Sequence, residues 1–291
     1  MIDETIEKIE RMETHSSSIV AIESLRALRA MRDRDFETVD AFIRTVERNS
    51  RALRRANPSH PTLFSCQRRV VELLTSTDIA DVETARQILE SAIDGGIEDI
   101  RTNKRQAAAA AVELLEDGAR ICTHDYSSTV IDAIGRASDA GIDLEVVIGE
   151  SRPRCFGRKT ARELRSDLEI PVTLAVDSAI GSLVADCDLV MTGMTCVVDG
   201  TLYNRVGTFP ILGAANYHGV PTYAVGSSGK VVPDHFVFEN DDRSPIEVLR
   251  EPIDGVTVEN LAYDASPFEL LDGIVTEAGL QAPPRLVFDE P

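Results

Sequence analysis

No run of apolar residues in this sequence of 291 residues approaches the length of about eighteen that a membrane-spanning helix needs. The opening segment, MIDETIEKIERM, is acidic and has helical spacing, and it lacks the basic start and apolar middle of a signal peptide. We therefore expect a cytoplasmic protein that has no membrane partner.

Paired cysteines are also missing. The five cysteines (Cys66, Cys122, Cys155, Cys187 and Cys196) form no C-x-x-C motif, and their number is odd. These features argue against a disulfide framework and against a zinc site, so we expect no metal. Most of the cysteines are expected to be small buried apolar residues.

Lysine is scarce, because only Lys8, Lys104, Lys159 and Lys230 occur and the other basic residues are arginines. The formal net charge is −19. Such an excess of carboxylates repels the phosphates of nucleic acids, so direct nucleic-acid binding is not expected. We interpret the composition as halophilic, since salt in a very salty cytoplasm would screen the self-repulsion of the chain.

Two nucleotide-binding motifs are absent. No G-x-G-x-x-G follows the first predicted strand, which disfavours a redox or dehydrogenase domain. The segment GSSGK, residues 226–230, lacks the leading glycine of a Walker loop, and Val231 follows its lysine. We expect no cofactor.

Helical patterns alone fill the first part of the chain, and we predict an N-terminal α-helical domain over residues 1–117. Apolar residues recur at helical spacing in SSSIVAIESLRALRAM and in DFETVDAFIRTVERNSRAL. HPTLFSCQRRVVELLTS starts with a proline signal, and VETARQILESAI should end at Gly95 and Gly96. A further helix through QAAAAAVELLEDG should close at Gly118. These patterns predict a helical bundle.

From Gly118 the period changes, which predicts a Rossmann-like α/β domain over residues 118–291. Short runs rich in Val, Ile and Thr alternate with helical patterns, as in a parallel sheet covered by helices. The predicted strands are ARICTH, DLEVVIG, PVTLAV, DLVMTG and PTYAV. Asp199-Gly200 predicts a hairpin turn. The tail from about Val232 is acidic and dotted with proline, and we expect it to wrap the domain or to serve an interface.

Four polar segments follow these strands and should meet at one edge of the sheet, where ligands of such sheets bind. They supply backbone N–H groups, hydroxyls and four cations: Arg152, Arg158, Arg205 and Lys230. One cation alone is more typical of a solvated or salt-bridged side chain, but four at successive strand ends favour an anion pocket.

The first strand end is the segment THDYSS, which contains His124, Asp125, Ser127 and Ser128. A histidine at such a place is more often a hydrogen-bonded scaffold residue than a catalyst. Asp125 is either a general base or a cap of the helix that starts near Ser127. His124, Ser127 and Ser128 are candidate ligand-binding residues.

The segment ESRPRCFGRKTARELRSDLEIPVTLAVDSAIGSLVADCDLV, followed by GTLYNRVGT, resembles the family of the alpha, beta and delta subunits of translation initiation factor 2B. That family also contains ribose-1,5-bisphosphate isomerase and methylthioribose-1-phosphate isomerase. The resemblance is strongest from Arg120 to Lys230. It implies a helical domain followed by a Rossmann-like domain, in agreement with the periodicities.

The resemblance also implies site residues. Those that match the family are Gly157, Arg158, Asn204, Gly207, Thr208 and Lys230, with Arg205 in place of a lysine. Asp125 stands where the isomerases have a catalytic cysteine, and Thr195 stands where they have a catalytic aspartate. His60 replaces a phosphate-contacting arginine, and Phe156 replaces a glutamine.

Aldose–ketose isomerisation moves a proton between adjacent carbons and needs a group to remove it and a group to return it. Asp125 could act as a base, whereas the hydroxyl of Thr195 does not ionise near neutral pH. We therefore predict a noncatalytic member, like an initiation factor 2B subunit, that binds a sugar phosphate or nucleotide through the anion pocket. It would act through assembly, as a homodimer or larger homo-oligomer, with a translation factor as a further possible partner. The alternative is a sugar-phosphate isomerase of the ribose-1,5-bisphosphate type.

Overall fold

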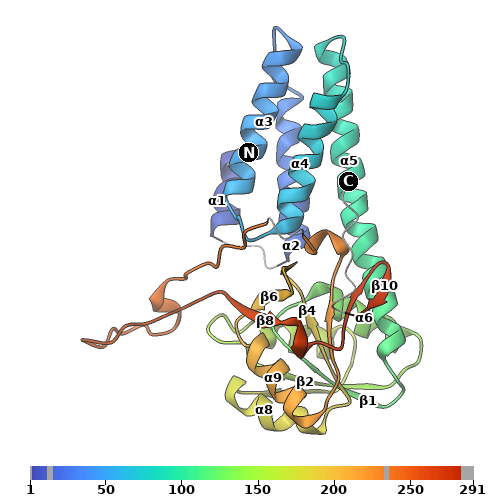
Figure 1. The fold of residues 1–291 in the computed structure, drawn as a ribbon, viewed down its shortest axis with the longest axis vertical. Helices are drawn as coiled ribbons and strands as arrows, with labels where there is room; N and C mark the ends of the chain where they lie inside the picture. The colour runs from blue at the N-terminus through green and yellow to red at the C-terminus, as the bar shows by residue number, and fades with distance from the viewer. Residues whose placement is uncertain (1, 12–15, 233–235, 283–291) are drawn as a thin grey trace. The chain divides into compact units, whose positions relative to one another are not determined.

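The computed structural model describes residues 2–11, 16–232 and 236–282, and the chain divides into two compact units, Met1–Thr102 and Asn103–Pro291 (Figure 1). The expected fold class is confirmed, with helices in the first unit and a mostly parallel sheet in the second. The division lies inside a helix and before the change of periodicity at residue 118, because Ala108 and Ala111 already pack in the core of the second unit.

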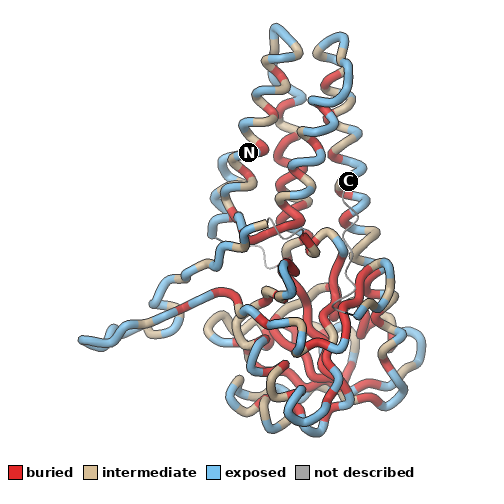
Figure 2. The backbone as a smooth tube through the Cα atoms, viewed as in Figure 1, coloured by how far each residue is buried: buried red, intermediate tan, exposed pale blue. Residues whose placement is uncertain are grey.

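The N-terminal unit is a bundle of helices around one apolar core. Its helices are α1 (Ile2–Glu10), α2 (Ser17–Leu28), α3 (Val39–Arg55), α4 (Pro61–Ser76) and the first part of α5 (Val82–Ala111), with a 3₁₀ turn at Arg29–Met31. Leu25, Phe42, Leu53, Leu63 and Leu89 are fully buried at the centre of this core. Figure 2 shows the buried residues as stripes along the helices, which is the pattern expected of amphipathic helices.

Helix α5 corrects one expectation. The two helices that were predicted to be separated at Gly95 and Gly96 are one helix of 30 residues. Ile93, Ile97 and Ile100 are buried on either side of the glycines. Their burial outweighs the roughly 1 kcal/mol that each glycine costs in a helix interior.

The C-terminal unit is built on a seven-stranded sheet with the strand order β10-β9-β7-β4-β1-β2-β3. All pairs are parallel except β9 with β10. The strands are β1 (Ala119–Thr123), β2 (Leu144–Gly149), β3 (Val172–Ala175), β4 (Leu189–Gly193), β7 (Thr222–Val225), β9 (Gly273–Thr276) and β10 (Gly279–Gln281). The five predicted strands are confirmed.

Helices cover both faces of this sheet. They are α6 (Ser128–Asp139), α7 (Phe156–Ser166), the four-residue α8 (Ile180–Leu183) and α9 (Thr208–His218). Successive strand residues alternate between two cores: Ile121 packs with α6 and α7, whereas Cys122 packs with α8 and α9. Residues 177–186, between β3 and β4, are mostly 3₁₀ turns around α8.

The tail also contributes strands to both sheets, which the sequence analysis did not predict. Its strands β9 and β10 extend the large sheet beyond β7. Its strand β8 (Tyr263–Pro267) joins β5 (Cys196–Val198) and β6 (Thr201–Arg205) in a second, three-stranded sheet. The predicted hairpin joins β5 to β6, with positive φ angles at Asp199 and Gly200. Residues 283–291 of the tail lie outside the described residues.

Within the described ranges, every helix is too short or too polar to span a lipid bilayer.

Candidate functional site

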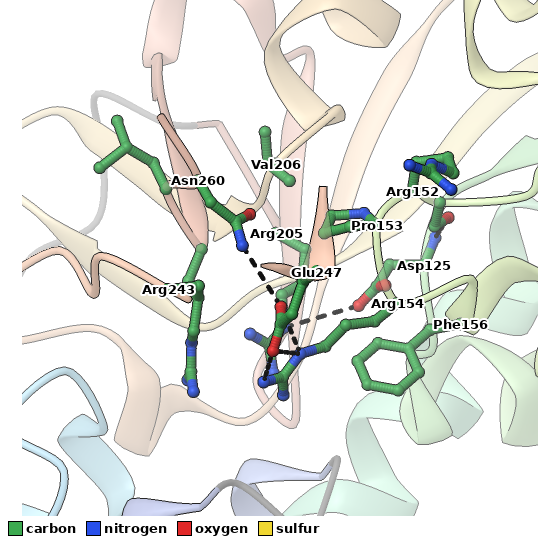
Figure 3. Close-up of a pocket in the computed structure, with 13 residues that line it drawn as sticks. Asp125, Arg152, Pro153, Arg154, Phe156, Arg205, Val206, Arg243, Glu247 and Asn260 are labelled. Atoms are coloured by element: carbon green, nitrogen blue, oxygen red, sulfur yellow. Dashed lines mark hydrogen bonds and ion pairs between the residues drawn. The ribbon is translucent and has the colours of Figure 1, made fainter. Parts of the chain in front are cut away.

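A pocket lies at the carboxyl ends of β1 and β2 in the C-terminal unit (Figure 3). The loop after β1 contributes Asp125, and the loop after β2 contributes residues 151–156. The end of β6 and the start of the tail complete the walls. The lining residues are Asp125, Ser151, Arg152, Pro153, Arg154, Phe156, Arg205, Val206, Arg243, Glu247, Asn260, Leu261 and Ala262.

The lining is positive although the protein is strongly acidic. The lining contains four arginines, Arg152, Arg154, Arg205 and Arg243, and two acidic residues, Asp125 and Glu247, and Arg243 also pairs with Asp241 at 2.5 Å. The chain as a whole has 49 acidic residues against 30 basic ones, so four arginines beside three carboxylates run against its composition. Arginine forks bind phosphate oxygens in pairs, which makes the pocket suited to a phosphorylated ligand.

Asp125 is held at the pocket wall by its backbone. Its φ of 58° puts it in the left-handed region, its N–H donates to Ser151 Oγ at 3.0 Å, and its carbonyl accepts from Thr160 Oγ1 at 2.6 Å. Its carboxylate lies 3.7 Å from Nε of Arg205, and both side chains are largely buried. The helix-cap interpretation does not apply, because Ser127 is the N-cap of α6 and its Oγ accepts from the N–H of Val130.

His124 is part of the scaffold. It is buried, its Nε2 is 2.8 Å from the carbonyl of Val206, and its Nδ1 is 3.4 Å from Ser151 Oγ. The ring packs so closely on Gly207 that a Cβ there would lie 2.6 Å from Cε1 of His124. Gly207 has a φ of 103° and precedes α9, so it is required both for space and for conformation.

The start of α7 packs closely against the end of β2. A Cβ on Gly157 would lie 1.8 Å from the carbonyl oxygen of Gly149, so only glycine lets α7 approach the end of β2. The carboxylate of Asp177 accepts from the N–H groups of Ser151 and Arg152, each at 2.7 Å, which fixes the loop that carries the arginines. Arg158 pairs with Glu150 and is half exposed, outside the pocket lining.

Thr195 belongs to a buried polar network next to β4. Its Oγ1 donates to Oδ1 of Asn204 at 3.4 Å. Nδ2 of Asn204 donates to Thr192 Oγ1 at 3.0 Å and to Thr208 Oγ1 at 3.1 Å. Thr208 in turn donates to the carbonyl of Arg205 at 2.7 Å. The network thus joins the end of β4 to the strand that carries Arg205.

Lys230 is buried, and its Nζ donates to the carbonyl of Met194 at 2.7 Å. Burial, with a smaller contribution from the charge of Lys104, lowers the pKa of this amine to about 8. The N-terminus of α9 already holds an internal anion, because Asp264 accepts from the N–H groups of Gly207 at 2.7 Å and Phe209 at 3.0 Å.

Of the residues predicted from the sequence, the pocket brings together Asp125, Arg152 and Arg205. The sequence analysis did not single out Arg154, Arg243, Glu247 or Asn260. Arg154 could have been found, because it follows Arg152 by two residues in the same loop. No periodicity in the tail points to Arg243, Glu247 or Asn260. In the described part of the chain, no group of three His, Cys, Asp or Glu side chains is arranged to hold a metal ion.

Comparison with known proteins gives a consistent family. The model of the Initiation factor 2 subunit family matches residues 13–283. A ribose 1,5-bisphosphate isomerase of Haloterrigena turkmenica is 30% identical over 272 residues, covering 87% of this chain and 81% of that protein.

Solved structures agree on the fold. Translation initiation factor eIF-2B of Pyrococcus horikoshii OT3 matches with a TM-score of 0.83 and 23% identity, over 98% of both chains. The tetrameric eIF2B-beta2-delta2 complex of C. thermophilum matches with a TM-score of 0.83 and 18% identity, over 95% of this chain and 90% of that one. These structures extend the match over both compact units.

Proposed function

This chain belongs to the Initiation factor 2 subunit family, and from that premise we propose that it is a sugar-phosphate isomerase in which Asp125 moves the proton. The observation that carries the proposal is the pocket itself, where a largely buried carboxylate lies among four arginines in an otherwise acidic protein. The isomerase relative, which is similar over most of both chains, favours this function over the noncatalytic role preferred from the sequence.

The chemistry requires the arginines to hold the phosphate and a base to reach a carbon-bound proton. A single carboxylate that lies on one face of the sugar can take the proton from one carbon and return it to the next. Arg205, whose Nε lies 3.7 Å from the carboxylate of Asp125, is placed to contact a phosphate or an oxyanion. The step balances because the proton that leaves C2 is delivered to C1, while the hydroxyl proton of C2 passes to the carbonyl oxygen of the open-chain aldose, or to the released ring oxygen of a 1-phosphorylated sugar. A ketone then remains at C2.

The second candidate is a noncatalytic binding protein, and Thr195 is the observation that favours it. The position lies in a neutral hydrogen-bonded network of threonine and asparagine side chains. Nothing in that network ionises near neutral pH. A protein that only binds would keep the arginines and do without a second acid–base group.

Asp125→Asn separates the two candidates. With ribose 1,5-bisphosphate in molar salt, we expect the wild type to form the ketose, and the variant to lose turnover by about a hundredfold or more while it still binds. Phosphorus NMR follows the conversion. Asp139→Asn, at the exposed end of α6, makes the same charge change and should behave as wild type. Binding without turnover by the wild type would reject the isomerase and support the noncatalytic candidate.

We also propose that the protein assembles as a homodimer or larger homo-oligomer through its C-terminal unit, with a translation factor as a possible further partner. The exposed apolar side chains of Leu174, Val176, Phe209 and Tyr217 on that unit support this assembly. A monomer mass from light scattering in molar salt would contradict it.

A further inference from the structure

A hairpin-like arm, residues 243–260, borders the pocket. Its base is closed by the N–H of Arg243, which donates to the carbonyl of Asn260 at 2.8 Å. Most of its residues are exposed, and the side chains of Ile246, Ile253 and Val256 are each more than half exposed. Little apolar burial therefore holds this arm in place, which is typical of a segment that opens at low cost.

Polar contacts tie the arm to the arginine loop after β2. Nη2 of Arg154 donates to Oε1 of Glu247 at 2.6 Å, and Nε of Arg154 donates to Oε2 at 3.1 Å (Figure 3). Nη2 of Arg152 donates to the carbonyl of Val248 at 3.2 Å. Asn260 steadies the same carboxylate with a contact of 3.4 Å from its Nδ2.

The groups that hold the arm are thus the groups that would hold a phosphate. The two oxygens of Glu247 lie across the fork of Arg154 as two phosphate oxygens would. Hydrogen bonds from Arg154 keep the pKa of the Glu247 carboxyl below its ordinary value, so the carboxylate is an internal anion at neutral pH.

We propose that Glu247 is a displaceable internal anion, and that a phosphorylated ligand and the docked arm compete for Arg154 and Arg152. Ligand binding then releases the arm, and a docked arm weakens binding. By linkage the two effects are equal in free energy. The identity of the ligand rests on the proposed function, but the competition requires only that it is an anion with phosphate-like oxygens.

The test compares the wild type with Glu247→Gln, which keeps the size of the side chain and removes its charge. Titration calorimetry in fixed salt measures the affinity for ribose 1,5-bisphosphate and for inorganic pyrophosphate. We expect Glu247→Gln to bind both probes about tenfold more tightly, because the arginines no longer face a competing carboxylate. Glu251→Gln is the matched control, since it makes the same charge change at an exposed position of the same arm, and it should match the wild type.

The arm itself gives a second measurement. Arg250 is exposed, and trypsin cuts after it faster when the backbone of the arm is free to fit the protease than when the arm is docked. We expect faster cleavage there in Glu247→Gln, and faster cleavage of the wild type when pyrophosphate is added. Thermal melts of each variant establish that cleavage reports the arm and not global unfolding.

The outcomes separate the two proposals. Equal or weaker binding by Glu247→Gln, or protection of Arg250 by pyrophosphate, would overturn the competition while leaving the sugar-phosphate function in place. Competition with pyrophosphate but no binding of ribose 1,5-bisphosphate by any variant would support the displaceable anion and reject the sugar-phosphate function. No response to either probe would overturn both.

Discussion

At the scale of single residues, Lys230 shows how a buried charge affects stability. Its amine is buried against the carbonyl of Met194, and among the described residues no carboxylate forms an ion pair with it. Burial lowers the pKa of this amine from its ordinary value of 10.5 to about 8. At neutral pH the folded protein therefore holds a charge that water would solvate better, which lowers the free energy of unfolding.

Lys230→Met is expected to raise the free energy of unfolding at pH 7 by about 2 kcal/mol, since a shift of one pKa unit corresponds to about 1.4 kcal/mol and the lost hydrogen bond offsets about 1 kcal/mol. Between pH 8 and 10.5 the unfolded wild type binds more protons at this group than the folded protein does. Wild-type stability therefore rises through that window, and the advantage of the variant shrinks. Chemical denaturation at pH 7 and pH 10 measures the difference in free energy of unfolding between the variant and the wild type. An advantage that grows with pH would contradict this account, and the exposed Lys8→Met serves as the control.

At the scale of elements, the sequence predicts the helices and strands that local residue patterns determine. It misses those that depend on contacts between residues far apart in the chain. Short apolar runs rich in Val, Ile and Thr located β1, β2 and β4, and the hairpin turn at Asp199 and Gly200 follows from residues that adopt positive φ. Helix α5 continues through its glycines because the isoleucines around them are buried, which propensity alone does not reveal. The strands of the tail, β8 to β10, were missed because each is short. β8 and β9 are held by pairing with the distant strands β6 and β7, and β10 pairs only with the neighbouring β9.

Gly95→Ala tests the continuity of α5. A Cβ at this position meets nothing within 4 Å, so the change should raise the free energy of unfolding by about 0.5–1 kcal/mol, as it does inside helices. Gly96→Ala should gain less, because its Cβ would lie 3.1 Å from Cδ1 of Leu25. Denaturant titration of both variants provides the measurement. A loss of stability in Gly95→Ala would mean that the helix ends at the glycines after all.

At the scale of the whole molecule, the net charge of the chain is negative, whereas the pocket is rich in arginine. The chain carries a net charge of −19, yet the pocket gathers four arginines, from the loop after β2, from β6 and from the tail. Arg152, Arg205 and Asp125 could be predicted because they follow strands of a recognisable sheet. Arg243, Glu247 and Asn260 could not be predicted, because they lie in the arm. No local sequence pattern indicates that the arm folds back to the pocket.

The central claim is that this arginine pocket binds a sugar phosphate, and titration calorimetry of ribose 1,5-bisphosphate in molar salt tests it most directly. The wild type should bind one ligand per chain with saturable heat. Arg205→Gln should bind at least tenfold more weakly, because a charged hydrogen bond to phosphate is worth about 1.5–3 kcal/mol. Arg162→Gln, on the exposed face of α7, should bind as the wild type does. No saturable heat with the wild type, or equal affinity in Arg205→Gln, would contradict the account.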